Sequence, residues 1–347
     1  MDAYQLENFM EWANGAFIGA YSGTGWSGTG SGTPTKVVDG DMGGSAMQFT
    51  SNPTLGVYQV PVSLAAVPHA ESFSLKRTVN FSATGSAQNG ILFSLNTGDD
   101  FRFIFGTLQL NSFSIIRTVG GVQTTMYTSP NTYQLGVVYN FAYHLDPTTG
   151  TLTFYDGTDV LFSTVVAAFV GAYVIGKYFG RFGTGTGSGT ARISNIYGYY
   201  NSAYVGPVAI RGAFATADDT LQDWTFTGGA SAWESIDGTF LNPPTEYIEA
   251  AALGEISDFV SGIDDTEVFG VYAVSLEYYA LRTDVSGVDM NGRLIQGASV
   301  TAGATTVPPT GSPQVFRDIW ATTNPNTGVG WVPADLPALG FGFERTS

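Results

Sequence analysis

The chain has 347 residues, of which 44% are hydrophobic, 14% are aromatic and only 12% are charged. Its formal net charge of −16 argues against a nucleic-acid binder and against an anionic membrane surface as a partner. Because the sequence has no cysteine, zinc–thiolate sites, disulfide frameworks and cysteine nucleophiles are excluded. The abundance of glycine and aromatic residues indicates strands separated by tight turns, so we expect an all-β protein.

The first thirty residues give weak signals of secondary structure. Residues 2–14 fit one or two helical turns, because Asp2 can cap them and Gly15 can end them, but a short strand fits nearly as well. The glycine-rich stretch 23–32 surrounds Trp26 and lacks the Lys-Ser/Thr pair of a phosphate-binding loop, so we expect a surface loop there. No basic region followed by an apolar run opens the sequence, and we therefore expect no secretory signal.

From residue 45 onward, apolar and polar residues alternate, and turn signals recur about every 8–12 residues. The most apolar stretch, 161–176, is too short and too rich in Ser, Thr and Gly for a membrane span, so we interpret it as strand, loop and strand. This regular spacing is typical of a sandwich or jelly roll. The other strands that we expect span residues 46–49, 72–81, 91–95, 101–105, 113–117, 139–145, 151–155 and 191–200.

The density of charge changes at Gly206 and Pro207, where we place a domain boundary. Residues 1–205 have a net charge of −3, whereas residues 206–347 contain 18 acidic and 5 basic residues and have a net charge of −13. The sequence therefore predicts two antiparallel β-sandwich domains, 1–205 and 206–347. In the second, we expect strands at 268–281, 315–320 and 339–344, and short strands and loops over 216–262.

A series of weak motifs runs through residues 7–200 in a characteristic order. They are residues 7–9, 25–28 and 43–49, the strand ending at Phe81, residues 90–95, the hairpin 150–157 and the strand 193–197. In this order they resemble the concanavalin A-like (laminin-G-like) jelly roll found in many secreted and phage proteins. The resemblance implies that the first domain is a jelly-roll sandwich.

A second set of motifs occupies residues 235–347. It comprises residues 243–248, 254–259, 271–281, 319–331 and 336–344. Within it, the spacing of Trp320, Asn-Pro, Thr-Gly and Trp331 is uncommon. The set resembles a small β-sandwich module of tailed-bacteriophage structural proteins. That resemblance implies a virion component without distinguishing capsid, tail tube and fibre.

Catalytic residues are hard to find in this sequence. Some relatives of the jelly roll are glycosidases, which need two carboxylates flanking a cleft. Their Glu-x-Asp-x-x-Glu run is absent here, and the acidic pairs Asp39/Asp41 and 99–100 lie in glycine-containing turns, where solvated carboxylates are expected. His69 and His144 are the only histidines, and no Gly-x-Ser-x-Gly nucleophile motif accompanies them. We therefore predict that the protein is not an enzyme and needs no organic cofactor.

Two clusters of carboxylates are candidates for binding Ca²⁺. Neither has the form of an EF-hand loop, and solvated surface carboxylates are the simpler interpretation of both. A calcium site in a loop between strands is the hypothesis for the first cluster, and calorimetry with millimolar Ca²⁺ tests it. The first cluster is Asp264, Asp265 and Glu267, and the second is Asp218, Asp219 and Asp223.

Four aromatic residues are candidates for a carbohydrate-binding platform on the first domain. They are Trp26, Tyr199, Tyr200 and Tyr204. Sandwiches of this type often hold ligands with aromatic residues in loops, because a ring can stack on the face of a sugar. The alternative is that these rings cover the edge of the sandwich or pack at a subunit interface.

The resulting hypothesis is a non-enzymatic virion structural protein of a tailed bacteriophage, placed on the particle surface as a capsid decoration, fibre or tail component. Its expected partners are other virion proteins and copies of itself in a homo-oligomer, without nucleic acid and without membrane insertion. The first alternative is a carbohydrate-binding adhesin that recognises host surface glycans through the N-terminal domain. The second is a glycan-degrading enzyme, which ranks last because no carboxylate pair stands at strand spacing.

Overall fold

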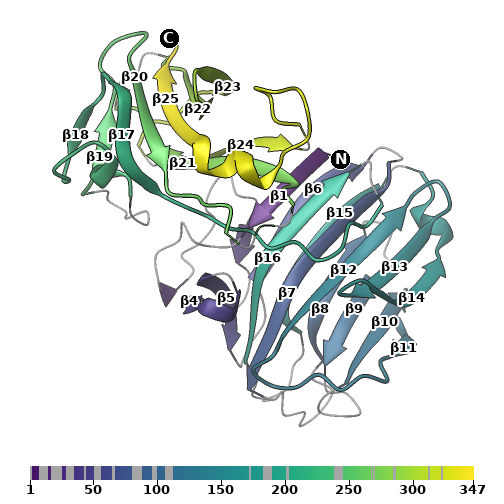
Figure 1. Ribbon diagram of the computed structural model, residues 1–347. Helices are drawn as coiled ribbons and strands as arrows, with labels where there is room; N and C mark the ends of the chain where they lie inside the picture. The colour runs from purple at the N-terminus through teal and green to yellow at the C-terminus, as the bar shows by residue number, and fades with distance from the viewer. Residues whose placement is uncertain are drawn as a thin grey trace. The chain divides into compact units, whose positions relative to one another are not determined.

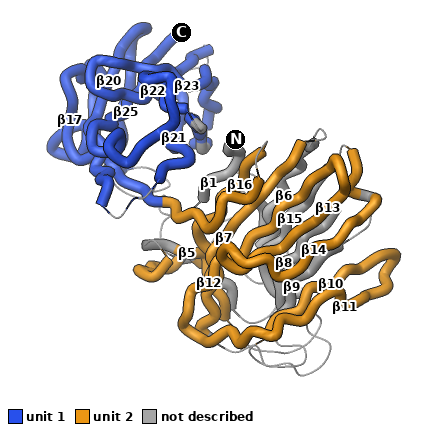
Figure 2. Tube along the Cα trace, turned by 45° about the vertical axis from the view of Figure 1, so that its right-hand side comes forward, with its two compact units in different colours: residues 1–3, 10–13, 211–347 blue, residues 4–9, 14–210 orange. Residues whose placement is uncertain are grey.

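The computed structural model shows an all-β protein with two compact units (Figures 1 and 2). One unit comprises residues 4–9 and 14–210, and the other comprises residues 211–347 together with residues 1–3 and 10–13 (Figure 2). The long segments of the two units thus meet between Ile210 and Arg211, whereas the sequence places the boundary between Val205 and Gly206. We call them the N-terminal and C-terminal units and describe each by itself. The described residues are 2–7, 15–16, 26–28, 35–42, 44–50, 56–64, 67–79, 88–95, 100–105, 112–171, 173–182, 190–200, 203–237, 245–266, 268, 270–283, 287–311, 313–321 and 323–347.

The N-terminal unit contains two antiparallel sheets. The nine-stranded sheet has the order β14 (Asp159–Val165), β13 (Thr151–Asp156), β12 (Val138–Asp146), β7 (His69–Val79), β16 (Thr190–Tyr200), β5 (Gly44–Thr50), β4 (Thr35–Asp39) and β2 (Gly15–Ala16), and β1 (Asp2–Glu7) pairs with β16. The seven-stranded sheet has the order β11 (Val122–Thr128), β10 (Phe113–Val119), β9 (Asp100–Phe105), β8 (Gln88–Leu95), β15 (Tyr173–Phe182), β6 (Gly56–Leu64) and β3 (Trp26–Gly28). This arrangement is consistent with a concanavalin A-like sandwich.

Aromatic side chains make close contacts within the described part of the core between these sheets. The ring of Phe113 in β10 meets the ring of Phe141 in β12 edge to face, with centroids 5.3 Å apart. Tyr133, which is buried, packs against both rings at 5.1 and 5.6 Å. Each such pair contributes about 0.5–1.5 kcal/mol beyond the burial of its area, so these contacts hold the two sheets face to face.

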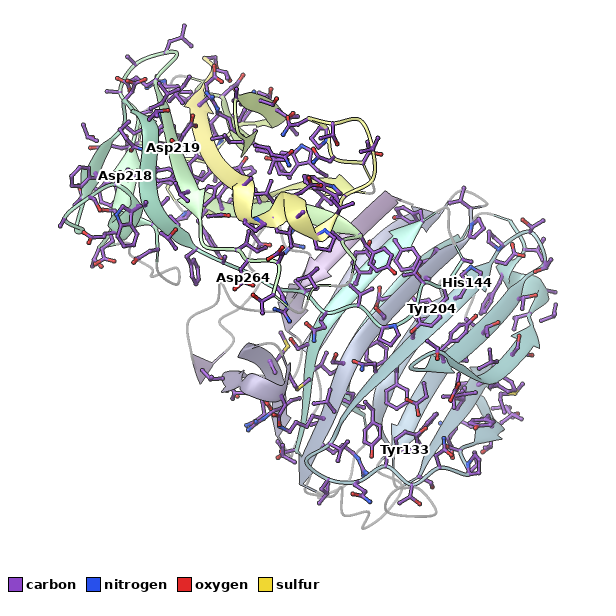
Figure 3. All side chains as sticks on the ribbon, viewed as in Figure 1. Tyr133, His144, Tyr204, Asp218, Asp219 and Asp264 are labelled. Atoms are coloured by element: carbon purple, nitrogen blue, oxygen red, sulfur yellow. The ribbon has the colours of Figure 1, made fainter. Side chains whose placement is uncertain are left out.

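After β16 the chain turns back over the outer face of the nine-stranded sheet, and we call residues 203–210 the 203–210 segment. Tyr204 lies over this sheet (Figure 3), where its ring is 4.2 Å from the ring of Tyr155 in β13. Its hydroxyl donates a hydrogen bond of 2.7 Å to the carbonyl oxygen of Gly157. The segment is therefore fixed to the sheet at its first residues.

Backbone groups of the 203–210 segment also bind side chains of β16. The N–H of Val205 donates to the hydroxyl oxygen of Tyr199 at 2.8 Å, and the N–H of Ile210 donates to Oδ1 of Asn195 at 3.0 Å. Asn195 has a φ of +52°, at a bulge where the pairing of β16 with β7 shifts. Because the segment lies on this face, the neighbouring rings of Tyr197 and Tyr199 are fully buried.

The C-terminal unit is a smaller antiparallel sandwich. Its five-stranded sheet has the order β17 (Ala215–Gln222), β20 (Ile256–Ser261), β25 (Leu339–Arg345), β22 (Met290–Gln296) and β23 (Ser299–Thr306). Two further pairs are β21 (Ala273–Ala280) with β24 (Gln314–Ala321) and β18 (Thr225–Thr227) with β19 (Tyr247–Glu249). The β21–β24 pair faces the larger sheet, because Tyr278 of β21 meets Phe343 of β25 edge to face at 5.2 Å.

The core of this unit divides into two apolar clusters. The first contains Phe259, Tyr278, Met290 and Phe343, with Leu276 and Phe316 packed against it. The second contains Leu294, Trp331, Leu336 and Leu339, with Val274 and Trp320 packed against it. Both clusters use the inner face of β24, since Phe316 and Trp320 belong to that strand. The residue midway between them on the same face is Asp318.

The all-β prediction is confirmed, and most expected strands from residue 45 onward are present within a few residues of their expected ends. The strand expected from residue 268 begins only at Ala273. The helix predicted for residues 2–7 is wrong, because these residues form the strand β1, the alternative that the sequence also allowed. Pairing with β16 satisfies the backbone of β1 and overrides a weak local preference for helix. Residues 8–14 lie outside the described part of the chain. Of the expected loop 23–32, residues 26–28 form β3 and pair with β6, and the rest lies outside the described residues.

Among the described residues there is no helix with the length and apolar character needed to cross a membrane.

Candidate ligand-binding groove

A β-bulge in the C-terminal unit creates the groove. Strands β22 and β23 pair in antiparallel register, but Asn291 pairs with Thr305 while Arg293 pairs with Ala302. Two residues of β23, Gly303 and Ala304, therefore stand opposite the single residue Gly292. A bulge of this kind disrupts the ladder locally and leaves a backbone group to be satisfied by other means.

The carboxylate of Asp318 enters this bulge from β24. Its Oδ1 accepts a hydrogen bond of 2.8 Å from the N–H of Ala304. A Cβ atom at either Gly292 or Gly303 would overlap the carboxylate, so glycine at both positions makes the room that Asp318 occupies. Only 6% of the Asp318 surface is exposed. The sequence thus combines a bulge, two glycines and one acid in a single local arrangement.

The second carboxylate oxygen of Asp318 has no hydrogen-bond partner among the described residues. Desolvation by burial raises the pKa of Asp318, and the hydrogen bond from Ala304 only partly opposes this shift. A buried polar group without a partner costs about 1–3 kcal/mol of stability. Such a group is unusual in a folded protein, and a functional role in contacting a ligand is one recognised explanation.

A cavity of about 400 Å³ is lined in part by Asp318, and we call it the Asp318 groove. It is lined by Ala302, Gly303 and Ala304 of β23 and by Arg317, Asp318, Ile319 and Trp320 of β24. The volume lies in the range of small-molecule sites, roughly 300–1,000 Å³. The lining of the groove therefore includes one acidic residue, Asp318, and one aromatic residue, Trp320.

Two contacts fix the β24 residues that flank Asp318. Arg317 points to the opposite face of the β21–β24 pair, where its Nε donates to Oε2 of Glu277 at 2.6 Å. Trp320 is partly buried against the second apolar cluster, and its carbonyl oxygen accepts a hydrogen bond of 3.0 Å from Nε1 of Trp331. The strand is thereby held in place on both faces beside the groove.

Of the four aromatic residues that the sequence suggests for sugar binding, the three with described side chains are at least partly buried. Tyr199 is fully buried, which corrects its assignment, because a ring covered by the 203–210 segment offers no face to a ligand. Tyr204 is partly buried on Tyr155, and burial raises its pKa. Tyr200 is partly buried as well, with its pKa raised by the same cause. Trp26 belongs to β3, and its side chain is not among those that the structure describes.

The suggested calcium ligands are only partly described. Asp264 and Asp265 are exposed after β20, and Oδ1 of Asp264 accepts a hydrogen bond of 3.1 Å from the N–H of Thr266. Glu267 lies outside the described residues. In the described part of the chain, no three His, Asp or Glu side chains are grouped so as to hold a metal ion. The calcium site stays a prediction.

The second acidic cluster supports the backbone. Oδ1 of Asp218 accepts from the N–H of Trp233 at 2.7 Å, and Oδ2 of Asp223 accepts from the N–H of Ile256 at 3.1 Å. Asp219 binds the N–H of Thr220 at 2.7 Å. Figure 3 shows Asp218 and Asp219 together and well apart from Asp264. These contacts give the cluster a structural role along β17 and at the start of β20.

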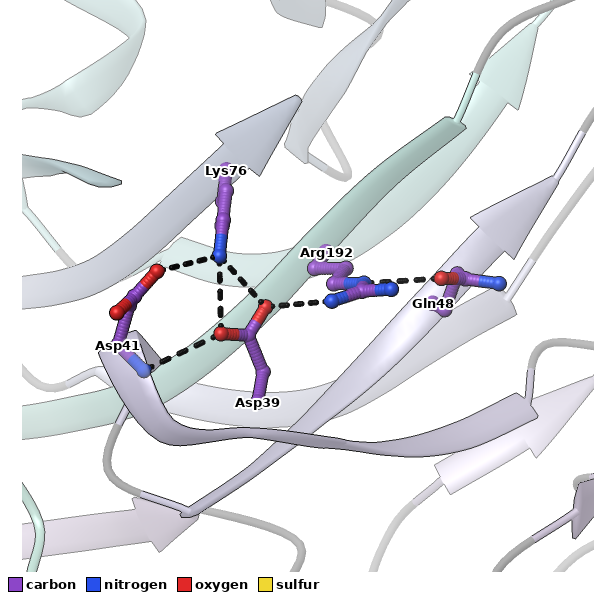
Figure 4. A network of polar contacts seen from close by, with 5 residues as sticks. All are labelled: Asp39, Asp41, Gln48, Lys76 and Arg192. Carbon is purple, nitrogen blue, oxygen red and sulfur yellow. Dashed lines mark hydrogen bonds and ion pairs between the residues drawn. The ribbon is translucent and has the colours of Figure 1, made fainter. Parts of the chain in front are cut away.

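Asp39 and Asp41 belong to an ion-pair network on the nine-stranded sheet (Figure 4). Nζ of Lys76 lies 3.0 Å from Oδ1 of Asp39 and 2.7 Å from Oδ2 of Asp41, and Nη1 of Arg192 lies 2.7 Å from Oδ2 of Asp39. Burial raises the pKa of Asp39, but hydrogen bonds from Arg192 and Lys76 outweigh this and hold it below its usual value. The hydrogen bond with Asp41 raises the pKa of Lys76. The network links β4 and the turn that follows it to the interior strands β7 and β16.

The two histidines lie in the same sheet. His69 is buried in β7, where its Nε2 is 2.9 Å from the hydroxyl oxygen of Tyr143. His144 is partly buried in β12 and pairs with Thr153 of β13. Both therefore take part in the packing of the nine-stranded sheet.

The sequence contains a signal for the groove that the search for paired carboxylates and loop aromatics passed over. Residues 315–320 alternate as a strand, so Phe316, Asp318 and Trp320 must share one face. An acid between two aromatic residues on an apolar face breaks the pattern expected of a buried strand. That exception marks Asp318.

No protein-family model matches this sequence, and no curated protein matches it. Among solved structures, the cellulose-induced protein Cip1 is 17% identical with a TM-score of 0.43, covering 59% of this chain and 100% of its own. The lectin UEA-II, solved with galactose, is 13% identical with a TM-score of 0.39, covering 58% and 100%. A carbohydrate-binding module from Bacillus subtilis is 9% identical with a TM-score of 0.31, covering 50% and 93%. At these values the matches give no argument about ligand or activity.

Proposed function

We propose that the protein is a non-enzymatic carbohydrate-binding protein and that the Asp318 groove is its binding site. The observation that carries the proposal is the buried Oδ2 of Asp318, which lacks a partner among the described residues and belongs to a residue that lines a groove together with Trp320. A sugar hydroxyl supplies the missing donor to this oxygen. The indole offers an apolar ring to the face of the sugar, as aromatic residues commonly do.

The lining of the groove supports binding without hydrolysis. Asp318 is the single carboxylate among the lining residues, and glycoside hydrolysis generally uses two carboxyl groups about 5–10 Å apart. Arg317 is paired with Glu277 on the opposite face. A single acceptor oxygen that orients a bound hydroxyl is sufficient for recognition.

This proposal is close to the adhesin alternative drawn from the sequence, with the site moved to the C-terminal unit. Of the N-terminal rings named for that role, Tyr199 is fully buried and Tyr204 packs on the ring of Tyr155. A location on a phage particle, contacts with other virion proteins and a homo-oligomeric state stay predictions, and light scattering at micromolar concentration tests the last of them.

The test is a glycan-array screen of the full chain, followed by titration calorimetry with the best sugar. Asp318→Asn keeps the shape of the side chain and its acceptor toward Ala304, but turns the free oxygen into an amide donor. Losing a hydrogen bond to a charged acceptor costs about 1.5–3 kcal/mol, so we expect affinity to fall roughly ten- to a hundredfold.

Asp264→Asn is the matched control, because it removes an exposed aspartate of the same unit and should leave affinity unchanged. Trp320→Leu should weaken binding as well, since it removes the ring at the wall of the groove. The proposal fails if no sugar binds above background. It also fails if Asp318→Asn binds the sugar as tightly as the parent protein.

A further inference from the structure

The charge of the C-terminal unit is one-sided. Residues 211–347 contain 18 acidic residues, five arginines and no lysine, which gives a net charge of −13. A surface of one sign raises the local concentration of oppositely charged ligands and lowers that of like-charged ones. This field favours cationic ligands at any site on the unit and opposes anionic ones.

Arginines of this unit are committed to other contacts. Arg317 pairs with Glu277, and Arg293 lies 3.4 Å from Oδ1 of Asp258. Arg345 donates to the carbonyl oxygen of Ala251 at 2.9 Å, and Arg211 donates to that of Thr266 at 2.9 Å. An anionic sugar would have to break one of these contacts to obtain a charged partner from these side chains.

Inside the Asp318 groove the remaining charge is that of the carboxylate. Arg317 also lines the groove, but Glu277 neutralises it. The carboxylate is desolvated, and it receives one hydrogen bond from a neutral backbone group. A neutral hydroxyl completes its hydrogen bonding without compensating its charge, whereas an ammonium group does both. The neighbouring indole of Trp320 adds a cation–π attraction that a hydroxyl does not receive.

We infer that the Asp318 groove selects amino sugars that carry a free ammonium group, over their N-acetylated counterparts and over uronic acids. This inference rests on the proposed function, because it names the class of sugar bound at the same site. The ammonium donates to Oδ2 of Asp318 while the sugar ring stands against Trp320. N-acetylation removes the charge and adds bulk, and a carboxylate substituent brings repulsion from Asp318 and from the whole unit.

The test is titration calorimetry of the full chain with three β-1,4-linked trisaccharides. The first is built of glucosamine, the second of N-acetylglucosamine, and the third contains glucuronic acid. We expect glucosamine to bind at least about tenfold more tightly than the acetylated form, and the acidic sugar to be weakest. The preference should shrink as salt is added, because screening weakens the attraction of the unit for a cation.

Variants assign the preference to Asp318. Asp318→Asn should abolish the preference for the glucosamine trisaccharide over the acetylated one. Trp320→Leu should weaken the binding of both of these trisaccharides. Asp264→Asn should change neither the preference nor the affinities. Equal or tighter binding of the acetylated trisaccharide overturns the inference but leaves the proposed function standing. Failure of every sugar to bind overturns both. The assignment to this groove is overturned if folded Asp318→Asn keeps the preference for glucosamine. It is also overturned if Asp264→Asn reduces that preference as much as Asp318→Asn does.

Discussion

At the scale of single residues, Asp318 is the most unusual side chain described in this protein. It stands on an apolar strand face between Phe316 and Trp320, and its carboxylate has one backbone donor. Its Oδ1 satisfies the bulge at Ala304, but an uncompensated buried charge lowers stability, so the unpartnered Oδ2 brings no gain in folding. Residues that reduce stability without a packing benefit are commonly those that a binding site requires.

The desolvation of this carboxylate predicts how Asp318→Asn changes stability. Burial raises the pKa of Asp318 above its unfolded value of 3.8, so the folded state holds the proton more tightly than the unfolded state. The contribution of this group to stability is therefore fully present below pH 3.8 and is lost as the pH rises through the folded-state pKa. We expect Asp318→Asn to be more stable than the parent at pH 7 by about 1 kcal/mol, with the difference vanishing in acid.

Denaturant unfolding of both proteins between neutral and acidic pH measures this difference. Asp258 also has a raised pKa, chiefly because of desolvation. Since Asp258 is present in both proteins, its contribution to the pH dependence cancels in the comparison. A difference that is constant with pH, or a variant that is less stable at neutral pH, would contradict the account of Asp318 as a desolvated charge.

At the scale of elements, the 203–210 segment acts as a third layer on the nine-stranded sheet. It is held by the Tyr204–Tyr155 ring contact and by hydrogen bonds to Gly157, Tyr199 and Asn195. Stacked rings and one hydrogen bond each contribute about 0.5–1.5 kcal/mol. We therefore expect Tyr204→Ala to destabilise the N-terminal unit by about 1–3 kcal/mol, and Tyr204→Phe by about a third to a half of that.

Hydrogen exchange reports on the same layer. The amides of Val205 and Ile210 donate to side chains of β16, so Tyr204→Ala should speed their exchange while leaving strands distant from the segment protected. Unchanged exchange at both amides would show that the ring of Tyr204 does not hold the segment.

Some strands and loops of this fold could be predicted from the sequence, and others could not. Alternation predicted strands such as β10 and β24 well, because side chains on one face of a strand must share an environment. It did not show that the 203–210 segment covers Tyr199, since a ring under another segment and a ring open to solvent give the same local pattern. Residues 2–7 were ambiguous because their strand depends on a partner, β16, far along the chain. Asp318 could have been found, but its bulge and its two glycines could not.

At the scale of the whole molecule, charge separates the two units more clearly than fold does. Both are antiparallel sandwiches, but residues 211–347 hold −13 of the total formal charge of −16. Mutual repulsion among these carboxylates opposes folding of the C-terminal unit, and salt screens exposed charges over about 8–10 Å at physiological ionic strength. The two units should therefore respond differently to added salt.

We expect added sodium chloride to raise the melting temperature of the C-terminal unit by a few degrees and that of the N-terminal unit by less. Scanning calorimetry of the full chain in low and high salt measures both transitions, and Tyr204→Ala identifies the transition of the N-terminal unit. Equal shifts of the two transitions would contradict a role for the one-sided charge.

The partition of basic residues has a practical consequence for how the protein is attached to surfaces. Its three lysines, Lys36, Lys76 and Lys177, all belong to the N-terminal unit, and Lys76 is buried between Asp39 and Asp41. Acylation of lysine side chains therefore modifies the first sandwich, and residues 211–347 offer no lysine to such a reagent. A sensor chip or bead coupled through lysine amines consequently displays the Asp318 groove chemically intact.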